Sequence, residues 1–503
     1  MALSRRLLIN GLAQTLAPIY IAKGANNNSS IKIALSALPP GKGNAFTTNQ
    51  APTILLTGGI FDGLTRMTKE GQVIPWLATS WEARGKLTWR FNLRENIVFS
   101  NGKPFNADAV ARTVNYLSGS GPVTEGLRRD FDFLDKAISI DNLTVDITTK
   151  IPVPMFPRYA AVLLIVEPNA WESMTTEEFA RNPVGTGPLK IKEWGVAKVL
   201  TEANTLSWRP MKIEQVEFIA LPDKTSRIQG IMAGQIDIAY ECAPDDFPVI
   251  KSIGGNIMAN RDGSVAAIML QFGKDKNSPL NDKRVRHALN YAVNKKAIIN
   301  VFFDGQTVES SQPAAQSVYG YNENIDSYDF DIKKARRLMK EAGHSGGFEI
   351  TLTTSGTGTN GELIVQTVAQ DLLKIGVKVK LVKQPIMQFI LDFVRGRIKS
   401  DAFTWPWVSY PIIDSIYTTK TNSCMKFNGW YCDESIQAII DQAWIEGEPE
   451  KALDLRKKIM RHYHAEAPSI FLYEYVGFVG LGPHIKEFDQ VFGYINFEKI
   501  TLK

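Results

Sequence analysis

The sequence predicts an α/β protein built from more than one lobe. At 503 residues the chain is too long for a single hydrophobic core, so two or three lobes are expected. Alternating and helical spacings of apolar residues follow one another along the chain, in a strand–turn–helix order near residues 87–117 and a strand–helix–strand order near residues 348–383. Mixed patterns of this kind are typical of sheets covered by helices.

In the first half, the segment from Leu87 to Leu93 alternates apolar and polar residues, which predicts a half-buried strand. Asn101-Gly102 predicts a turn, and Asn106 stands where the N-cap of a helix is expected. Apolar residues then recur at helical spacing; they are Val110, Val114 and Leu117.

In the second half, Phe348–Thr354 reads as a strand and Gly376 as the stop of the helix that follows it. The apolar face of that helix is marked by Ile364, Val368, Leu372 and Ile375. A second strand starts at Val377, so this is a βαβ unit with a parallel strand pair. A further helix is expected after Cys432, with Ile436, Ile439, Ile440 and Ala443 on one face.

Composition and charge are those of an ordinary globular protein, with 44% hydrophobic and 22% charged residues. The formal net charge is +5, but residues 1–24 contain three basic residues and no acidic one. Without these three, 54 of the 57 basic residues remain against 52 acidic ones. This near balance is not the charge of a nucleic-acid-binding protein, so no nucleic-acid partner is expected.

The first 24 residues resemble an export signal. Arg5-Arg6 precede an apolar run over residues 7–22, and small residues follow it. A twin-arginine signal and a general secretion signal both fit this pattern. Because no cysteine lies near the cleavage region, a lipid anchor is not expected, and we expect a periplasmic location.

The three cysteines suit an oxidising compartment. Cys424 and Cys432 lie eight residues apart, whereas Cys242 stands alone, so a Cys424–Cys432 disulfide is expected and three buried thiols are the alternative. The five histidines show no ligand spacing with the cysteines, so no metal site is expected.

Several blocks, in order along the chain, resemble the extracytoplasmic solute-binding proteins of peptide/nickel/opine-type ABC importers, the bacterial solute-binding protein family 5. The blocks are Ala78–Glu82, Phe91–Phe99, Asn101–Val110, Asn182–Pro188, Asp282–Asn294, Ala335–Gly343 and Ala467–Tyr473. The resemblance implies a two-lobed periplasmic-binding-protein fold of the large, cluster C type, with an inserted subdomain in the first lobe. It also implies a monomer without a cofactor that closes over a small-molecule ligand and delivers it to the transmembrane permease subunits.

Mapped onto this chain, the resemblance divides it into an export signal (1–24), a first lobe (25–263), a second lobe (264–476) and a return to the first lobe (477–503). The inserted subdomain is expected at about residues 60–170. The chain would cross between the lobes near Asp262–Ala266 and Glu474–Gly480, where glycines tolerate the dihedral change of a hinge.

The ligand site departs from that of peptide-binding relatives. Their motif G-W-x-x-D-Y-P-D-P supplies an aspartate for the peptide ammonium, and aligned on Tyr-Pro this chain has Ser409 there and Ile412 at the second aspartate. The arginine that holds a dipeptide carboxylate is absent from Ser355–Val365. The arginine of nickel-chelate binders is absent from residues 160–165.

A small polar solute, such as a sugar-phosphate or an opine-like compound, is therefore expected rather than an ordinary free peptide. A di- or oligopeptide and a nickel chelate remain alternatives, and Arg128-Arg129 is either an anion contact or a solvated surface pair. The expected ligand-binding residues are Trp405, Trp407, Ser409, Tyr410, Asn428, Gly429, Trp430, Tyr431, Gly356 and Gly358.

No enzyme activity is expected, and a secreted hydrolase is the alternative from another class. Gly343–Gly347 fits G-x-S-x-G, but a helix precedes it and a strand follows, the reverse of a nucleophile elbow. Gly356–Gly361 fits G-x-G-x-x-G, yet the next strand ends in Lys383-Gln384-Pro385, without the acid that a dinucleotide ribose needs.

Overall fold

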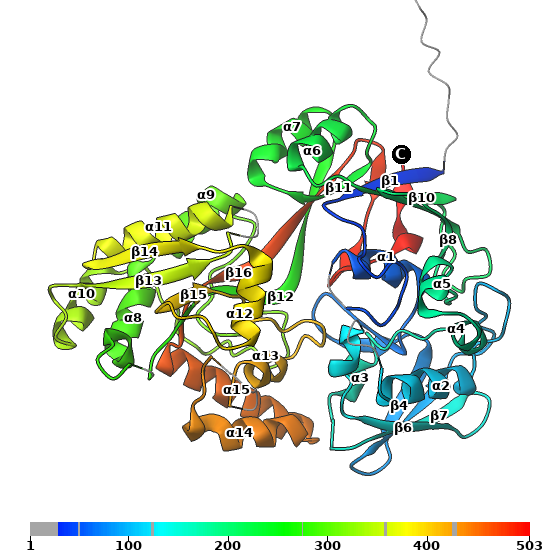
Figure 1. The fold of residues 1–503 in the computed structure, drawn as a ribbon, viewed down its shortest axis with the longest axis horizontal. Helices are drawn as coiled ribbons and strands as arrows, with labels where there is room; N and C mark the ends of the chain where they lie inside the picture. The colour runs from blue at the N-terminus through cyan, green and yellow to red at the C-terminus, as the bar shows by residue number, and fades with distance from the viewer. Residues whose placement is uncertain (1–28, 49–50, 122–124, 274, 357–359, 425–429) are drawn as a thin grey trace, which may run out of the picture.

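The computed structural model describes residues 29–503 apart from 49–50, 122–124, 274, 357–359 and 425–429. The expected export signal lies outside the described residues, as do three expected ligand-binding residues, Asn428, Gly429 and Gly358. The described chain forms the predicted α/β structure with two lobes, which lie side by side in Figure 1.

One ten-stranded sheet runs through both lobes. In spatial order its strands are β14 (Val377–Lys383), β13 (Phe348–Thr354), β15 (Ala402–Thr404), β12 (Asn256–Leu270), β16 (Ser469–Leu481), β11 (Ile238–Cys242), β1 (Ser30–Leu35), β10 (Gln215–Ala220), β9 (Lys198–Ala203) and β8 (Leu189–Trp194). The first three strands belong to the second lobe and the last five to the first lobe (Figure 1).

β12 and β16, the central strand pair, connect the two lobes. Their antiparallel register runs from Asn256↔Leu481 to Arg261↔Val476, breaks, and resumes from Val265↔Glu474 to Met269↔Ser469. The first stretch borders β11 and the second borders β15, so each long strand passes from one lobe into the other. The predicted crossings lie in these two strands, and the predicted lobe boundaries stay predictions.

The βαβ unit predicted in the second lobe is confirmed. β13 pairs in parallel with β14 along its whole length, and α11 (Gly361–Leu373) connects them. Ile364, Val368 and Leu372 on this helix are buried, as their spacing predicted. The helix expected after Cys432 is α14 (Glu434–Ile445), which buries Ile436, Ile440 and Ala443.

A separate four-stranded sheet lies within the range predicted for the inserted subdomain. Its strands, in spatial order, are β4 (Ala78–Ala83), β5 (Thr88–Leu93), β7 (Thr144–Thr149) and β6 (Leu134–Ser139). Asn106 caps α2 (Ala107–Ser118), since its side chain accepts a hydrogen bond from the backbone of Ala109 at 3.1 Å. Phe91 and Leu93 are buried as predicted, whereas Leu87 precedes the strand and is 39% exposed.

The other helices cover the faces of the sheets. In the first lobe they are α1 (Thr53–Ile60), α3 (Phe156–Tyr159), α4 (Pro168–Ser173), α5 (Thr176–Arg181), α6 (Lys224–Met232) and α7 (Phe247–Ser252). In the second they are α8 (Lys283–Ala292), α9 (Lys295–Phe303), α10 (Ile332–Glu341), α12 (Ile386–Val394), α13 (Ser415–Thr421) and α15 (Pro449–Glu466). In the described part of the chain, none of the helices combines the length and apolar character that crossing a membrane requires.

Short strand pairs complete the first lobe. They are β2 (Thr65–Met67) with β3 (Val73–Pro75), β17 (Ile485–Glu487) with β20 (Thr501–Leu502), and β18 (Gln490–Val491) with β19 (Tyr494–Ile495). The last two pairs come from the C-terminal segment, which returns from the second lobe to pack beside β2 (Figure 1).

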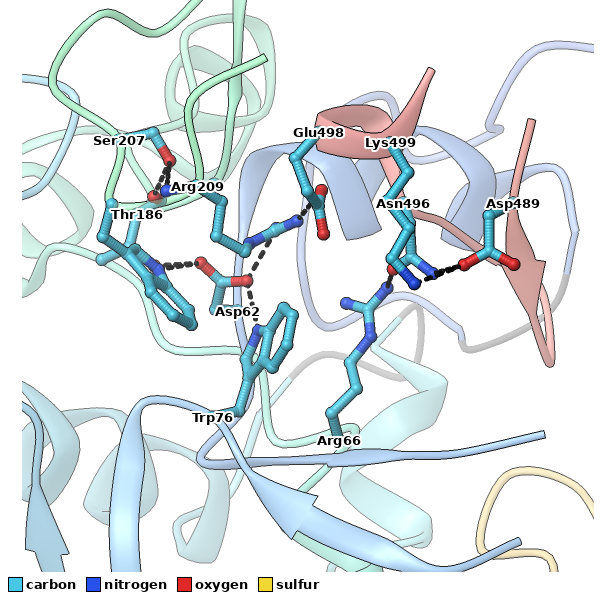
Figure 2. A network of polar contacts seen from close by, with 12 residues as sticks. Asp62, Arg66, Trp76, Thr186, Ser207, Arg209, Asp489, Asn496, Glu498 and Lys499 are labelled. Carbon is cyan, nitrogen blue, oxygen red and sulfur yellow. Dashed lines mark hydrogen bonds and ion pairs between the residues drawn. The ribbon is translucent and has the colours of Figure 1, made fainter. Parts of the chain in front are cut away.

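A buried polar network around Asp62 holds together the part of the first lobe that β2 and this C-terminal segment form. Arg209 forms an ion pair with Asp62 at 2.8 Å and another with Glu498 at 2.7 Å (Figure 2). Asp62 also accepts hydrogen bonds from Trp76, Thr186 and Trp208. Burial raises the pKa of Asp62, but Arg209 and these hydrogen bonds lower it by more, so its pKa lies below the ordinary carboxyl value.

Substitution of Asp62 should therefore be strongly destabilising. Asp62→Asn turns an amide N–H toward donors and leaves Arg209 with one acid, so we expect a loss of about 3 kcal/mol in the free energy of unfolding. Because the folded pKa is lowered, the contribution of Asp62 is present above about pH 4 and is lost as the pH falls through the folded pKa. The variant should thus lose less stability on acidification than the unmodified protein.

Urea denaturation between neutral and acidic pH measures both effects. Asp108→Asn is the matched control, because Asp108 pairs with Arg112 on the surface with 59% of its side chain exposed. Equal effects of the two substitutions at neutral pH would show that the buried network does not stabilise the fold.

Candidate functional site

A small cavity lies between the two lobes, at the level of the central strand pair. The volume of the cavity is only about 10 Å³, so the facing walls nearly touch. The second lobe contributes Tyr410 and Pro411, from the segment after β15. The first-lobe wall consists of Arg66, Met67, Ala161, Val162, Val491, Phe492 and Tyr494.

The segment around Tyr410 is held against the first lobe by Arg158. The Arg158 guanidinium donates hydrogen bonds to the carbonyl oxygens of Gly71, Ile412 and Ile413 at 2.9, 3.3 and 3.2 Å. It also lies 4.9 Å from the centre of the Tyr319 ring. The two sides of the cavity are therefore joined by direct contacts in this form of the protein.

Arg66 is a buried cation on the first-lobe wall. Its side chain is 7% exposed, and its guanidinium lies 4.8 Å from the ring centres of both Trp76 and Tyr494. One nitrogen donates to Asn496 Oδ1 at 2.7 Å (Figure 2). Burial, followed by the charge of Arg209, lowers the pKa of Arg66 to about 10, so the group is still protonated at neutral pH.

Two tyrosine hydroxyls on the cavity wall have no hydrogen-bond partner within the described residues. They belong to Tyr410 of the second lobe and Tyr494 of the first, and both oxygen atoms are buried. An unpaired buried hydroxyl costs about 1–3 kcal/mol, and such groups are rare in folded proteins. Together with Arg66 they give the cavity three polar groups whose hydrogen-bonding capacity is only partly used.

The predicted aromatic residues form a continuous cluster in the second lobe. Trp407 is fully buried, and its indole N–H donates to Ser469 Oγ at 2.9 Å. Trp405 stacks on Phe393 with ring centres 4.5 Å apart, and Trp430 meets Trp407 edge-on at 5.6 Å. The Tyr431 side chain, 6% exposed, donates its hydroxyl to Asp433.

These aromatic side chains are not among the residues that line the cavity. Of the predicted residues that the structure describes, Tyr410 is the one that lines the cavity. Gly356 follows β13 in the left-handed conformation, with φ of 65°, and is not among the lining residues. The assignment of Trp405, Trp407, Trp430, Tyr431 and Gly356 to ligand binding stays a prediction.

Ser409, which replaces the ammonium-binding aspartate of peptide receptors, is fully buried, and its hydroxyl has no hydrogen-bond partner in the described structure. The acid in the same segment, Asp414, forms a buried ion pair with Arg456, with nitrogen–oxygen distances of 2.7 and 3.1 Å. Asp414 is thus neutralised by the protein itself.

Arg128 makes its polar contacts within the first lobe. It pairs with Glu125 at 2.9 Å and donates to the backbone carbonyl of Tyr116 at 2.6 Å. Among the described residues, no group of three or more histidine, cysteine, aspartate or glutamate side chains is arranged to hold a metal ion.

The expected disulfide between Cys424 and Cys432 is present. Cys242 is a free, buried thiol, and burial raises its pKa to about 12, which keeps it protonated. The bridge joins Cys424, which follows α13, to Cys432, which precedes α14, and Trp430 and Tyr431 lie between the two cysteines.

Comparison with known proteins identifies the family. Residues 72–421 match the family model of bacterial extracellular solute-binding proteins, family 5. The chain belongs to this family. The match covers most of the chain and includes most of the blocks that suggested the resemblance.

Three relatives illustrate the similarity. The glutathione-binding protein GsiB of Pectobacterium atrosepticum is 28% identical over 492 residues, covering 94% of this chain and 93% of the relative. Heme-binding protein A of Haemophilus influenzae is 25% identical over 521 residues, covering 96% and 93%. The structure of HbpA2 from Haemophilus parasuis superposes with a TM-score of 0.81 at 24% identity, covering 94% of this chain and all of that chain.

The family and the two-lobed fold are therefore established, and the protein is a solute-binding component of an ABC importer. The relatives are named for what they bind rather than for a reaction. The predicted family, fold class and disulfide are confirmed by these findings.

The disulfide should contribute measurably to stability. Closing a loop of this length restricts the unfolded chain by about 2–3 kcal/mol, so the Cys424→Ala/Cys432→Ala variant should lose an amount of this order in urea denaturation. Dithiothreitol should lower the stability of the unmodified protein toward that of the variant and leave the variant unchanged.

Cys242→Ala is the matched control, because its thiol is already reduced and buried. The control should still lose stability in dithiothreitol, and the double variant should not. This pair of results would assign the loss of stability to the bridge. A double variant as stable as the unmodified protein would contradict the prediction.

Proposed function

We propose that this protein is a monomeric periplasmic receptor that captures a small polar solute between its lobes and delivers it to the permease of an ABC importer, without catalysing a reaction. The observation that carries the proposal is the cavity beside the central strand pair, whose lining comes from both lobes. Sites of this kind, at the interface of two rigid bodies, are where ligand binding can be coupled to closure.

The central strand pair has the features of a hinge. The register between β12 and β16 breaks where one residue, Tyr475, stands opposite Asp262, Gly263 and Ser264. The strand pairing on either side of the break does not depend on these residues. Gly263 has a φ of 78°, a conformation that favours glycine, and the Asp262 carboxylate accepts a hydrogen bond from the backbone of Ser264. Rotation at this break would open the cavity while leaving both halves of the sheet paired.

The favoured ligand is a solute that does not need a carboxylate partner for a free ammonium group, such as an opine-like compound or a sugar-phosphate. Ser409 supports this choice because it offers a hydroxyl where peptide receptors offer a charge. Asp414 supports it because Arg456 already neutralises this acid. A buried ammonium without a counter-charge is costly.

A γ-linked peptide of the glutathione type is the second candidate, since a relative that aligns over 94% of this chain is named for glutathione. Its ammonium would need another acid, and Asp262 is a candidate. Burial is the largest cause of the raised pKa of Tyr410. The neighbouring Tyr494 is the second cause, and the charge of Asp262 is the third. Burial also raises the pKa of Asp262 itself, which forms no ion pair among the described residues.

The receptor proposal predicts closure on binding. A cognate solute should bind one-to-one and, at a hundredfold excess over its dissociation constant, stabilise the fold by about 2.7 kcal/mol. X-ray scattering of the monomer should then show a smaller radius of gyration with the solute than without it. Turnover of a solute, without a thermal shift from any member of a metabolite library, would refute the proposal.

The ligand assignment predicts poor binding of ordinary peptides. An uncompensated charge penalty of about 3 kcal/mol corresponds to more than a hundredfold in affinity, so free α-linked di- and tripeptides should bind at least this much more weakly than the native solute. Calorimetry of Ala-Ala and its N-acetylated form provides the matched pair, and acetylation should not weaken binding.

Substitutions then separate the two candidates. Ser409→Asp should not improve binding of the favoured type of solute. If low-micromolar binding of glutathione is found and Asp262→Asn abolishes it, Asp262 has taken over the ammonium and the second candidate is correct.

A further inference from the structure

We propose that Arg66, together with the hydroxyls of Tyr410 and Tyr494, forms a subsite for an anionic group of the solute, a carboxylate or a phosphate. The inference rests on the proposed receptor function and specifies the chemistry of its ligand. It assigns a role to a residue outside the segments that carry the family resemblance.

The pairing of the buried arginines singles out Arg66. The structure describes five arginines as buried. Four of them have an acid within 3.1 Å; these ion pairs are Arg209–Asp62, Arg227–Glu241, Arg286–Glu466 and Arg456–Asp414. Arg66 has no acid within ion-pair distance among the described residues; the charges of Asp62 and Glu498 act on it from farther away, and its side-chain hydrogen bond is to a neutral amide. A buried cation without an acid in direct contact is unfavourable for folding, so its retention points to an anion that arrives with the ligand.

The guanidinium is held in a fixed orientation. It lies 4.8 Å from the centres of both the Trp76 and the Tyr494 rings. Trp76 is itself fixed by its hydrogen bond to Asp62 (Figure 2). Asn496, which accepts from Arg66, donates in turn to Asp489 at 2.7 Å. Since one donor is used by Asn496 and Arg66 lines the cavity, the remaining N–H groups are available to a bound anion without a costly rearrangement.

The two hydroxyls add donors from opposite lobes. Tyr494 belongs to the first lobe and Tyr410 to the second, and both oxygens are buried at the cavity without a partner in the described structure. An anion that accepts from Arg66 and from both hydroxyls would contact the two lobes at once. It would therefore bind the closed form more tightly than an open one, which is the differential affinity that closure requires.

The subsite restricts the ligand class. Carboxylates and phosphates match the planar donors of arginine, so glutathione and a sugar-phosphate both satisfy it, whereas a neutral sugar does not. Calorimetry at constant ionic strength can test this with two matched pairs of probes: glutathione against its diethyl ester, and glucose 6-phosphate against glucose. Inorganic phosphate serves as a probe of the anion site alone, monitored by thermal shift.

We expect Arg66→Met to weaken the acidic member that binds by about tenfold or more, the size typical of lost charge-assisted hydrogen bonds, without affecting the member of the pair that lacks the acidic groups. Arg66→Lys should be intermediate, because it keeps the charge and loses the planar donors. Tyr410→Phe and Tyr494→Phe should each weaken the same acid several-fold. The ligand-free melting temperature of Arg66→Met should fall by no more than a few degrees, since the substitution removes an unpaired buried charge.

Arg94→Met is the matched control. Arg94 lies 4.9 Å from the Trp208 ring and donates to the Trp76 carbonyl, so it belongs to the same aromatic surroundings but does not line the cavity. It should leave binding of every probe unchanged. If Arg66→Met does not fold, Arg66→Lys and the two Tyr→Phe variants carry the test.

The outcomes separate this inference from the receptor proposal. An acidic probe that binds the unmodified protein and the Arg66 variants within a factor of about two would overturn the anion subsite and leave the receptor proposal standing. If no member of either organic pair binds, the thermal shift caused by inorganic phosphate is the test of the role of Arg66. Stabilisation of the unmodified protein by phosphate that is lost in Arg66→Met supports the subsite, and no such difference refutes it.

Discussion

The antiparallel pairing of β12 and β16 is the constraint on which the arrangement of both lobes depends. β11 is attached to one end of this pair and β15 to the other, and the remaining six strands of the sheet follow from these two attachments. The larger of its two register shifts is at Asp262–Ser264, where three residues oppose one; the other lies between Ala266 and Ala267. Because backbone hydrogen bonds persist on either side, a change at this break moves whole lobes rather than single strands. The cavity lies beside the break, so the hinge motion proposed above would change its width.

The two walls of the cavity are stabilised in different ways. Behind the first-lobe wall lies a polar network in which Arg209 forms ion pairs with Asp62 and Glu498. Asp62 also accepts hydrogen bonds from the neighbouring tryptophans and so fixes their positions. The wall of the second lobe rests on the aromatic cluster around Trp407 and on the buried pair Arg456–Asp414. These ion pairs lie behind the cavity surface, whereas Arg66 lies on that surface and has no acid within ion-pair distance among the described residues.

The fold was predictable from sequence wherever local patterns decide structure. The N-cap at Asn106 and the βαβ unit at Phe348–Lys383 depend on side chains close together in the chain, and both are present. The Cys424–Cys432 bridge joins residues eight apart, so spacing and compartment sufficed. The cavity is different, since Arg66 and its partner Asn496 are 430 positions apart. No periodicity links them, and the return of the C-terminal segment to β2 is what places Tyr494 against Arg66. Tyr410 was found because the family motif marks its position.

The predicted aromatic set shows the limit of reading function from residue type. Tryptophan has the same sequence signature whether it binds a ligand ring or fills a core, and Trp407 is fully buried with its N–H satisfied by Ser469. An unsatisfied polar group is more informative, because folding alone gives no reason to keep it buried. Tyr410 carries such a group on the cavity wall, because its buried hydroxyl has no hydrogen-bond partner among the described residues. We therefore expect unused hydrogen-bonding capacity, rather than aromatic area, to indicate where this cavity contacts a solute.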